Sequence, residues 1–347
     1  MKRIILSGVY LFLAVGMIAQ TAVLNVNESG TMKGEAVASY FLPRTVLEVE
    51  VEAIRTIREV GPYAADARKH FGAPAKIQRN EESWTINTVN VTQKSEPDVR
   101  NQYRVYVPAK SNAALLALTE TGILRGINLP FSSEKEARHL NTTQEEEKVT
   151  GSSFIFNYYI HETDSSESPA SAVFDQINSL REARLNILLQ YNDVLQHGSA
   201  VEAYLREIDK REEDLKALFN GIERKEVVRR TFIVYPDNEV TGQKIFHFSE
   251  AQGFSETGSP VTITLRRNSA EDRLTSSEKK DRTGFVYRMP ALVEVEVAGG
   301  DKTVFWSGQI GVAQLGKLVS LPAGLFDKDN IRAVFDTNTG ALLQIGR

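Results

Sequence analysis

The chain of 347 residues contains no cysteine at all. Disulfides, thiolate metal sites and lipid attachment at a processed N-terminal cysteine are therefore excluded, so the fold must be stabilised by its core. No strong charge of one sign is present either, since 41 Lys and Arg stand against 45 Asp and Glu and are scattered along the chain. Without a basic stripe to neutralise phosphates, a nucleic-acid partner is not expected.

Long hydrophobic runs are also missing, apart from one at the start of the chain. Lys2 and Arg3 precede an apolar run from Ile4 to Ile18, and small residues follow it. This pattern predicts a secretory signal peptide over residues 1–19. The alternative, a transmembrane anchor, needs about 20 apolar residues, more than this run supplies. We therefore expect an exported protein of the periplasm or cell surface that is not integral to the membrane after cleavage.

The remaining composition is typical of a globular protein, with 41% hydrophobic and 25% charged residues. Its many aromatic and β-branched residues favour strands, and its length suggests about two domains. We predict a β-rich α+β fold with two β units on either side of a long antiparallel helical hairpin. The expected order is a signal peptide (1–19), a linker (20–39), β unit 1 (40–130), a polar connection (131–153), a strand plus the helical hairpin (154–225) and β unit 2 (226–347).

Helical periodicity is strongest in the middle of the chain. Apolar residues spaced by three and four positions predict one helix over 170–191 and a second over 199–219, which Ser199 can cap. The expected apolar stripe of the first helix consists of Val173, Ile177, Leu180, Leu188 and Tyr191. That of the second consists of Val201, Leu205, Ile208, Leu215 and Leu218.

The stretch "VLEVEVEA" at residues 46–53 places Glu48, Glu50 and Glu52 on one face of a strand. A near copy, "LVEVEV", lies at 292–297. Two further blocks match in the same order: Val107-Pro108-Ala109 with Leu321-Pro322-Ala323, and "TETGILRGI" (119–127) with "TNTGALLQI" (337–345). The order favours an internal duplication over convergence, and the carboxylates then mark a solvated strand face.

With these blocks, the chain resembles an uncharacterised family of exported bacterial proteins of about this length, a domain of unknown function typical of Gram-negative gut anaerobes. The resemblance is carried by "YFLPRTVLEVEVEA", "GPYAADARKHFG", "FIFNYYI", "REARLNILL", "KIFHFSEAQGF", "TGFVYRMPALVEVEV" and "FDTNTGALLQI", together with the signal peptide. These segments span nearly the whole chain after the first twenty residues. The resemblance implies export and a shared architecture, and it implies no catalytic or binding residue.

No motif for catalysis or metal binding emerges. The histidines lack metal-ligand spacing, and they are His70, His139, His161, His197 and His247. "SSEK" at 132–135 and 276–279 matches the Ser-x-x-Lys of acyl-serine enzymes but falls in polar stretches, and "DKDN" at 327–330 lacks the rest of a calcium loop. We assign no catalytic, cofactor-binding or metal residue, and we expect no cofactor.

Aromatic residues leave a second function open. Trp84, Trp306, Tyr158 and Tyr159 are candidates for a carbohydrate-stacking platform, although core packing is the commoner fate of strand tryptophans. Our first hypothesis is an exported, non-enzymatic cell-envelope protein with a structural, adhesion or assembly role. The second is a periplasmic or surface glycan-binding protein, and the third is a hydrolase. An envelope protein or a glycan is the expected partner.

Overall fold

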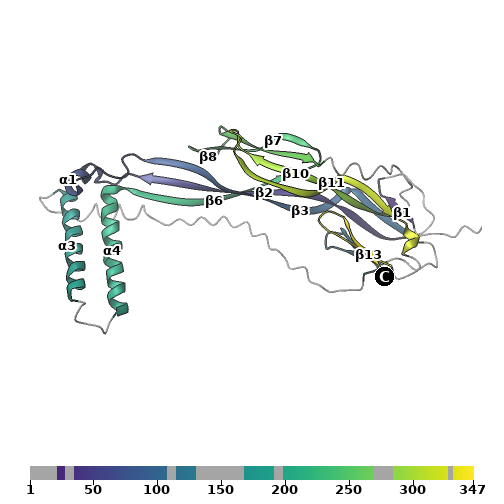
Figure 1. The fold of residues 1–347 in the computed structure, drawn as a ribbon, viewed down its shortest axis with the longest axis horizontal. Helices are drawn as coiled ribbons and strands as arrows, with labels where there is room; N and C mark the ends of the chain where they lie inside the picture. Colours follow the sequence, from purple (N-terminus) through teal and green to yellow (C-terminus); the bar gives the residue numbers. More distant parts are fainter. Residues whose placement is uncertain are drawn as a thin grey trace, which may run out of the picture.

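The computed structural model describes residues 22–27, 35–107, 115–129, 168–190, 198–268, 284–326 and 331–347. The fold is β-rich, as predicted, and its strands form three sheets. The molecule is elongated: the sheets follow its long axis, and two helices project to one side at one end (Figure 1). The signal peptide, the polar connection and the strand expected near residue 155 lie outside the described residues.

The first sheet is built on two very long strands. β2 and β3 pair from Glu35 opposite Val107 to Arg58 opposite Glu81. Their alternating sequence makes this possible, because every second side chain enters the core while its neighbours meet solvent. In spatial order the strands are β1 (Ala22–Asn25), β3 (Glu81–Val107), β2 (Glu35–Glu59) and β6 (Ile222–Val234).

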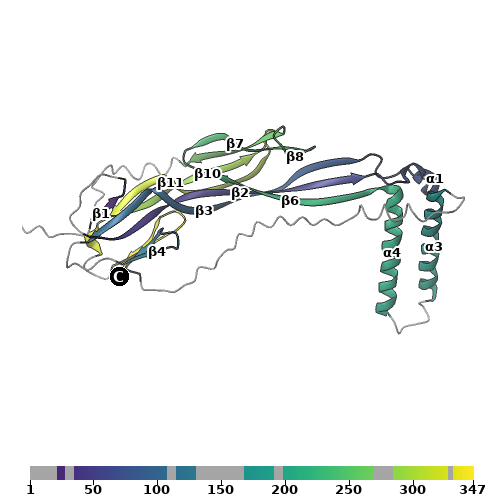
Figure 2. The same ribbon diagram turned by 180° about the vertical axis from the view of Figure 1, so that it is seen from behind.

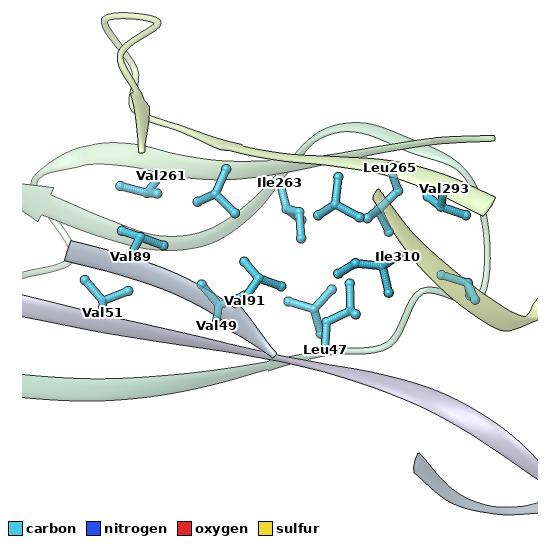
Figure 3. Packing of buried hydrophobic residues seen from close by; sticks show 14 of the residues in the cluster. Leu47, Val49, Val51, Val89, Val91, Val261, Ile263, Leu265, Val293 and Ile310 are labelled. Atoms are coloured by element: carbon cyan, nitrogen blue, oxygen red, sulfur yellow. The ribbon is translucent and has the colours of Figure 1, made fainter. Parts of the chain in front are cut away.

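The second sheet packs face to face on the middle of the first. Its strands, in spatial order, are β11 (Val304–Leu321), β10 (Phe285–Ala298), β9 (Ser259–Arg267), β7 (Val240–Ser249) and β8 (Gly253–Phe254). Figure 3 shows aliphatic side chains from both sheets meeting in one layer. Burying each such side chain contributes about 1.5–3 kcal/mol, so this layer is a main source of stability. Its members include Leu47, Val49, Val51, Val89, Val91, Val261, Ile263, Leu265, Val293 and Ile310.

The third sheet unites two short hairpins from distant parts of the sequence. Its spatial order is β13 (Leu342–Gly346), β12 (Arg332–Phe335), β5 (Leu124–Ile127) and β4 (Leu116–Leu118). A second core lies beside it, in which Tyr40 and Tyr103 stack with ring centroids 5.5 Å apart. The short helix η4 (Ala323–Leu325) follows β11 and contributes Ala323 to this core.

Four helical segments lie at the other end of the molecule. They are η1 (Ala64–Asp66), α1 (Ala67–Phe71), α3 (Pro169–Gln190) and α4 (Gly198–Asn220). Ser168 caps α3 by accepting a hydrogen bond from the Ser171 backbone N–H, and Pro169 suits the first helical position. Among the described residues, no helix combines the length and apolar character needed to cross a membrane.

α3 and α4 pack side by side, and we call them the helix pair (Figure 2). They run antiparallel, because Arg181 pairs with Glu212 and Arg184 with Asp209, each at 2.8 Å. Near the sheets their contact is a closed core of Val173, Ile177, Leu215, Leu218 and Phe219. The first and last residues of α3 and of α4 agree within two residues with those of the helices predicted from periodicity. The predicted stripe is wrong at Leu188, however, whose side chain is 41% exposed.

A three-stranded arm carries the helix pair. We define the arm as residues 54–59 of β2, 81–85 of β3 and 222–227 of β6, which remain paired beyond the sandwich. Figure 1 shows these strands continuing past the second sheet to the helices. None of the arm residues belongs to the aliphatic core between the sheets, and at the base of the arm Trp84 contacts Glu250 and Gly253 at the edge of the second sheet. The arm therefore separates the helix pair from the sandwich.

The sheets do not follow the predicted units along the sequence. β6, from the C-terminal side of the helices, pairs with β2, and β12 pairs with β5. The predicted linker contains β1, which pairs with β3, and the first residues of β2. Backbone hydrogen bonding between distant segments, which residue patterns do not encode, decides these pairings.

Candidate functional site

A cavity of about 670 Å³ lies where two strand pairs lose their regular register. The partner of β2 jumps from Gln102 to Asp98 between Phe41 and Leu42. In the same way, the partner of β10 jumps from Lys317 to Val312 between Met289 and Ala291. The residues left out of pairing bulge from β3 and β11. The cavity is lined by Arg44, Glu96, Pro97, Asp98, Val99, Arg100, Asn101, Asp237, Arg288, Gln314, Gly316 and Leu318.

A buried ion pair is part of the lining of this cavity. Arg288, only 5% exposed, donates through Nη2 to Oδ2 of Asp98. Asp98 also accepts hydrogen bonds from the Arg100 backbone N–H at 3.0 Å and from Asn101 Nδ2 at 2.8 Å. Burial lowers the pKa of Arg288, and the charge of Asp98 opposes that change. The pair thus fastens β10 to the bulge of β3.

Arg44 joins three elements at the cavity rim. It donates to Asp237 from Nη2 at 2.6 Å and from Nε at 3.2 Å, and to Glu96 at 3.2 Å. Its guanidinium carbon lies 4.5 Å from the ring centre of Tyr235. The hydrogen bond to Asp237 raises the pKa of Arg44, with further support from Glu96.

Gln314, which lines the cavity, hydrogen-bonds the backbone of β2 as a neighbouring strand would. Its Oε1 accepts from the Thr45 backbone N–H at 2.8 Å, and its Nε2 donates to the Thr45 carbonyl at 2.9 Å. The Ala313 backbone N–H in turn donates to Thr45 Oγ1 at 2.9 Å. β6 stops pairing with β2 at Leu47, so Gln314 satisfies backbone groups beyond that point. The cavity is consequently held by polar contacts that link both sheets.

In the carboxylate row of β2, two of the three glutamates bind side chains of neighbouring strands. Glu48 pairs with Lys94 at 2.6 Å, while Glu50 is exposed. Glu52 accepts from Asn87 at 2.7 Å and from Arg229 at 3.0 Å. These hydrogen bonds, that from Asn87 first, lower the pKa of Glu52. Because strands β3 and β6 supply the partners, the row ties the first sheet together.

Charged side chains continue this pattern along the arm. Arg55 pairs with Glu82 of β3 at 2.9 Å and with Glu226 of β6 at 3.1 Å. Three residues further along β2, Arg58 pairs with Glu223 of β6 at 2.8 Å and with Glu81 of β3 at 3.5 Å. Each arginine therefore bridges all three strands. Such a network holds the three strands together at the end of the sheet that lies outside the aliphatic core between the sheets.

The distal half of the helix pair exposes apolar side chains. Leu185 is 56% exposed and Leu189 65%, and with Leu188 they follow the i, i+3, i+4 spacing of one helix face. Tyr204 of α4 is 60% exposed. We call these four residues the leucine face. Helical periodicity could have revealed it, but the same periodicity also describes a core stripe.

The described histidines and tryptophans make packing contacts and hydrogen bonds with neighbouring residues. His70 lies 4.8 Å from the ring of Phe174, and His247 Nδ1 lies 2.6 Å from the Glu256 carbonyl oxygen. Gly253 lies against the Trp84 ring, and Trp306 packs beside the aliphatic core. In the described part of the chain, no group of three metal-ligating side chains occurs. His139, His161, His197, Tyr158, Tyr159, both "SSEK" segments and "DKDN" lie outside the described residues.

Residues 36–343 match the model of DUF4831, a domain of unknown function. The chain belongs to the DUF4831 family. No curated protein and no solved structure matches it significantly. Because the family model starts in β2 and ends in β13, the DUF4831 domain contains the helix pair and nearly all of the three sheets, whereas β1 lies before it and the last residues of β13 lie after it.

Two features of this DUF4831 chain were not predicted from its sequence. The cavity joins a bulge near Val99 to one near Gln314, more than two hundred positions away in the sequence. Within β3, "EPDVRN" carries a turn-like composition in a strand, which is the local signal for its bulge. The leucine face depends on how far the two helices remain in contact, which periodicity does not measure.

Proposed function

We propose that the protein is an exported, non-enzymatic component of the cell envelope with a structural, adhesion or assembly role. The observation that carries this proposal is the arm, which holds the helix pair and its leucine face away from the sandwich. Exposed apolar side chains at the end of an ion-paired support are typical of a surface displayed for contact. The sandwich acts as the base, and the helix pair acts as the contact element.

The charge network of the arm supports this role. A three-stranded sheet that extends beyond the aliphatic core has little apolar surface to bury, so cross-strand pairs must contribute to holding it. Arg55 and Arg58 supply such pairs on both sides of β2. A stiff support lets a helix pair reach a partner without bending back onto its own sandwich.

Within this proposal the two β units descend from one duplicated unit. The Phe41 backbone N–H donates to the Gly122 carbonyl, and the matching Arg288 N–H donates to the Gly340 carbonyl, at 2.9 and 3.3 Å. Gly122 and Gly340 both have φ near +80°, which glycine adopts without strain. The two matching bulges that line the cavity support the same origin. The helix pair then lies between the two duplicated units.

Export rests on the N-terminal segment, and it is tested by finding the mature N-terminus. We expect N-terminal sequencing of the protein from its native host to begin at Gln20, and fractionation to place it in the envelope. A cytosolic protein that retains Met1 would refute export. Labelling of intact cells with a membrane-impermeant reagent then separates a surface location from a periplasmic one.

The displayed contact element is tested by in-cell cross-linking. A photo-reactive residue placed at Leu189 should form cross-links in the envelope, whereas the same residue at the exposed Lys244 of β7 should not. Cross-links of equal yield from both positions would contradict a specific contact at the helix pair.

A further inference from the structure

The apolar side chains of the helix pair are buried near the arm and exposed toward its far end. Near the arm, Ile177 and Leu215 are fully buried between the helices. Toward the far end, Leu185, Leu188 and Leu189 project from α3 while Tyr204 projects from α4. Two helices alone cannot enclose an apolar layer on both sides, whereas a four-helix bundle can.

A groove of about 380 Å³ between the helices carries opposite charges on its two sides. α3 contributes Arg181 and Arg184 together with Leu185 and Leu188, and α4 contributes Asp209 and Glu212. The α3 side of the groove therefore carries the arginines and the α4 side the carboxylates, and within one chain they pair across the groove, Arg181 with Glu212 and Arg184 with Asp209. The apolar side chains continue from the α3 side.

This arrangement is complementary to itself. A two-fold axis parallel to the helices, passing between two facing groove surfaces, places α3 of each copy over α4 of the other. Arg184 then faces Asp209 of the second copy at the same height along the bundle. Each helix also gains a second antiparallel neighbour, as in a four-helix bundle. An axis across the helices would instead set Arg184 near its own copy.

We propose that the helix pair binds a second copy of this chain through the groove and the leucine face, forming a four-helix bundle. The proposal rests on the proposed function in taking the helix pair as the contact element, and it goes further by naming the occupant. Leu185 and Leu188 of each copy close the apolar layer, and the arginine and carboxylate rows fix its register.

The overall shape admits this dimer. In Figures 1 and 2 the helices cross the long axis of the molecule, and α3 lies farther from the sheets than α4. A rotation of 180° about an axis parallel to the helices therefore directs the two sandwiches to opposite sides. The dimer has the helical bundle at its centre and a sandwich at each end, and the two sandwiches do not meet.

The first test is the mass of the purified protein, measured by sedimentation across roughly 1–100 µM, where interfaces of modest size associate. We expect a concentration-dependent dimer, and a rise of more than about tenfold in its dissociation constant for Leu185→Asp/Leu189→Asp. Leu343→Asp, an equally exposed leucine of β13, is the matched control and should leave the constant unchanged. Circular dichroism checks that every variant is folded. A monomer throughout, or equal effects of both variants, would overturn the proposal.

The second test exchanges the charges of the groove. Arg184→Asp/Asp209→Arg keeps the ion pair within each chain and reverses both sides of the groove, so the variant should dimerise with itself. It should not form mixed dimers with the unaltered chain, because like charges would then face each other. Fluorescence energy transfer between differently labelled chains measures the exchange. Mixed dimers as abundant as the pure ones would refute the predicted register.

The two tests separate this inference from the proposed function. A monomeric protein that is nevertheless found in the envelope and cross-links through Leu189 to a different protein would overturn the dimer and leave the envelope role standing. A protein that dimerises in solution but is never exported would overturn the envelope role and leave the dimer standing.

Discussion

Tyr40 of β2 and Val286 of β10 are joined by two hydrogen bonds. The tyrosine hydroxyl donates to the Val286 carbonyl at 3.0 Å and accepts from the Val286 N–H at 2.9 Å, and both residues are fully buried. β10 pairs with β9 only from Val293 onward, so the hydroxyl satisfies backbone groups that no strand reaches. One side chain thus completes a strand edge between the two sheets.

Replacing Tyr40 with phenylalanine should destabilise the protein by about 1–3 kcal/mol, because it leaves a buried N–H and a buried carbonyl without partners. Urea unfolding measures this free energy. Tyr106→Phe is the control, because Tyr106 is partly exposed and its hydroxyl makes no hydrogen bond within the described residues. Equal losses for the two variants would contradict the role of Tyr40.

The same tyrosine predicts a response to alkaline pH. Burial raises the pKa of Tyr40 well above its usual value of 10.0. A raised pKa in the folded state gives stability that is complete below the unfolded pKa and lost as pH rises through the folded one. The unaltered protein should therefore lose stability above about pH 10 more steeply than Tyr40→Phe. Parallel pH profiles for the two would disprove this.

The buried pair of Asp98 and Arg288 predicts a large, non-additive effect. Asp98→Ala leaves the buried guanidinium uncompensated and should cost about 3–5 kcal/mol. Asp98→Ala/Arg288→Met removes both charges and should recover most of that loss. Glu96→Ala, which removes an ion pair at the cavity rim, should cost less than about 1 kcal/mol. Additive losses in the double variant would show that the two charges do not depend on each other.

Glu212 predicts acid sensitivity of the helix pair. Burial raises the pKa of Glu212, but hydrogen bonds from Lys216 and Arg181 outweigh it and lower the pKa overall. The resulting stability is present above the unfolded pKa of about 4.3 and is lost as pH falls through the lower folded value. Glu212→Gln should weaken the helix pair by about 1–2 kcal/mol near neutral pH. Amide hydrogen exchange in α3 measures this loss of stability. The control is Glu207→Gln, at an exposed position, which should leave the exchange rates unchanged.

Gly253 predicts a clash that can be separated from backbone strain. Its φ of +65° disfavours other residues, and an added Cβ would lie 2.5 Å from the Trp84 ring. Gly242 has a φ of +66° and open space around it. Gly253→Ala should therefore cost about 1–3 kcal/mol more than Gly242→Ala in thermal or urea unfolding. Equal losses of stability in the two variants would mean that the Trp84 side chain moves aside without cost.

Several features of the fold follow from the sequence alone. Alternation in "VLEVEVEA" determines a strand with Leu47, Val49 and Val51 inward, because the backbone sends successive side chains to opposite faces. Helical spacing likewise places α3 and α4 within two residues of their predicted bounds. Both are local effects, since neighbours along the chain define the period.

Tertiary structure alone decided what those elements contact. Glu48 and Glu52 form ion pairs because β3 and β6 supply Lys94 and Arg229, and no local pattern specifies either partner. Leu188 lies in the predicted stripe of α3 and yet faces solvent, because the closed core of the helix pair lies nearer the arm. The cavity needs two bulges that strand pairing brings together across the chain. Sequence determines the period with which apolar and polar side chains alternate along each element, because that period depends on chain neighbours alone. Long-range packing determines which apolar faces are covered and which residues meet.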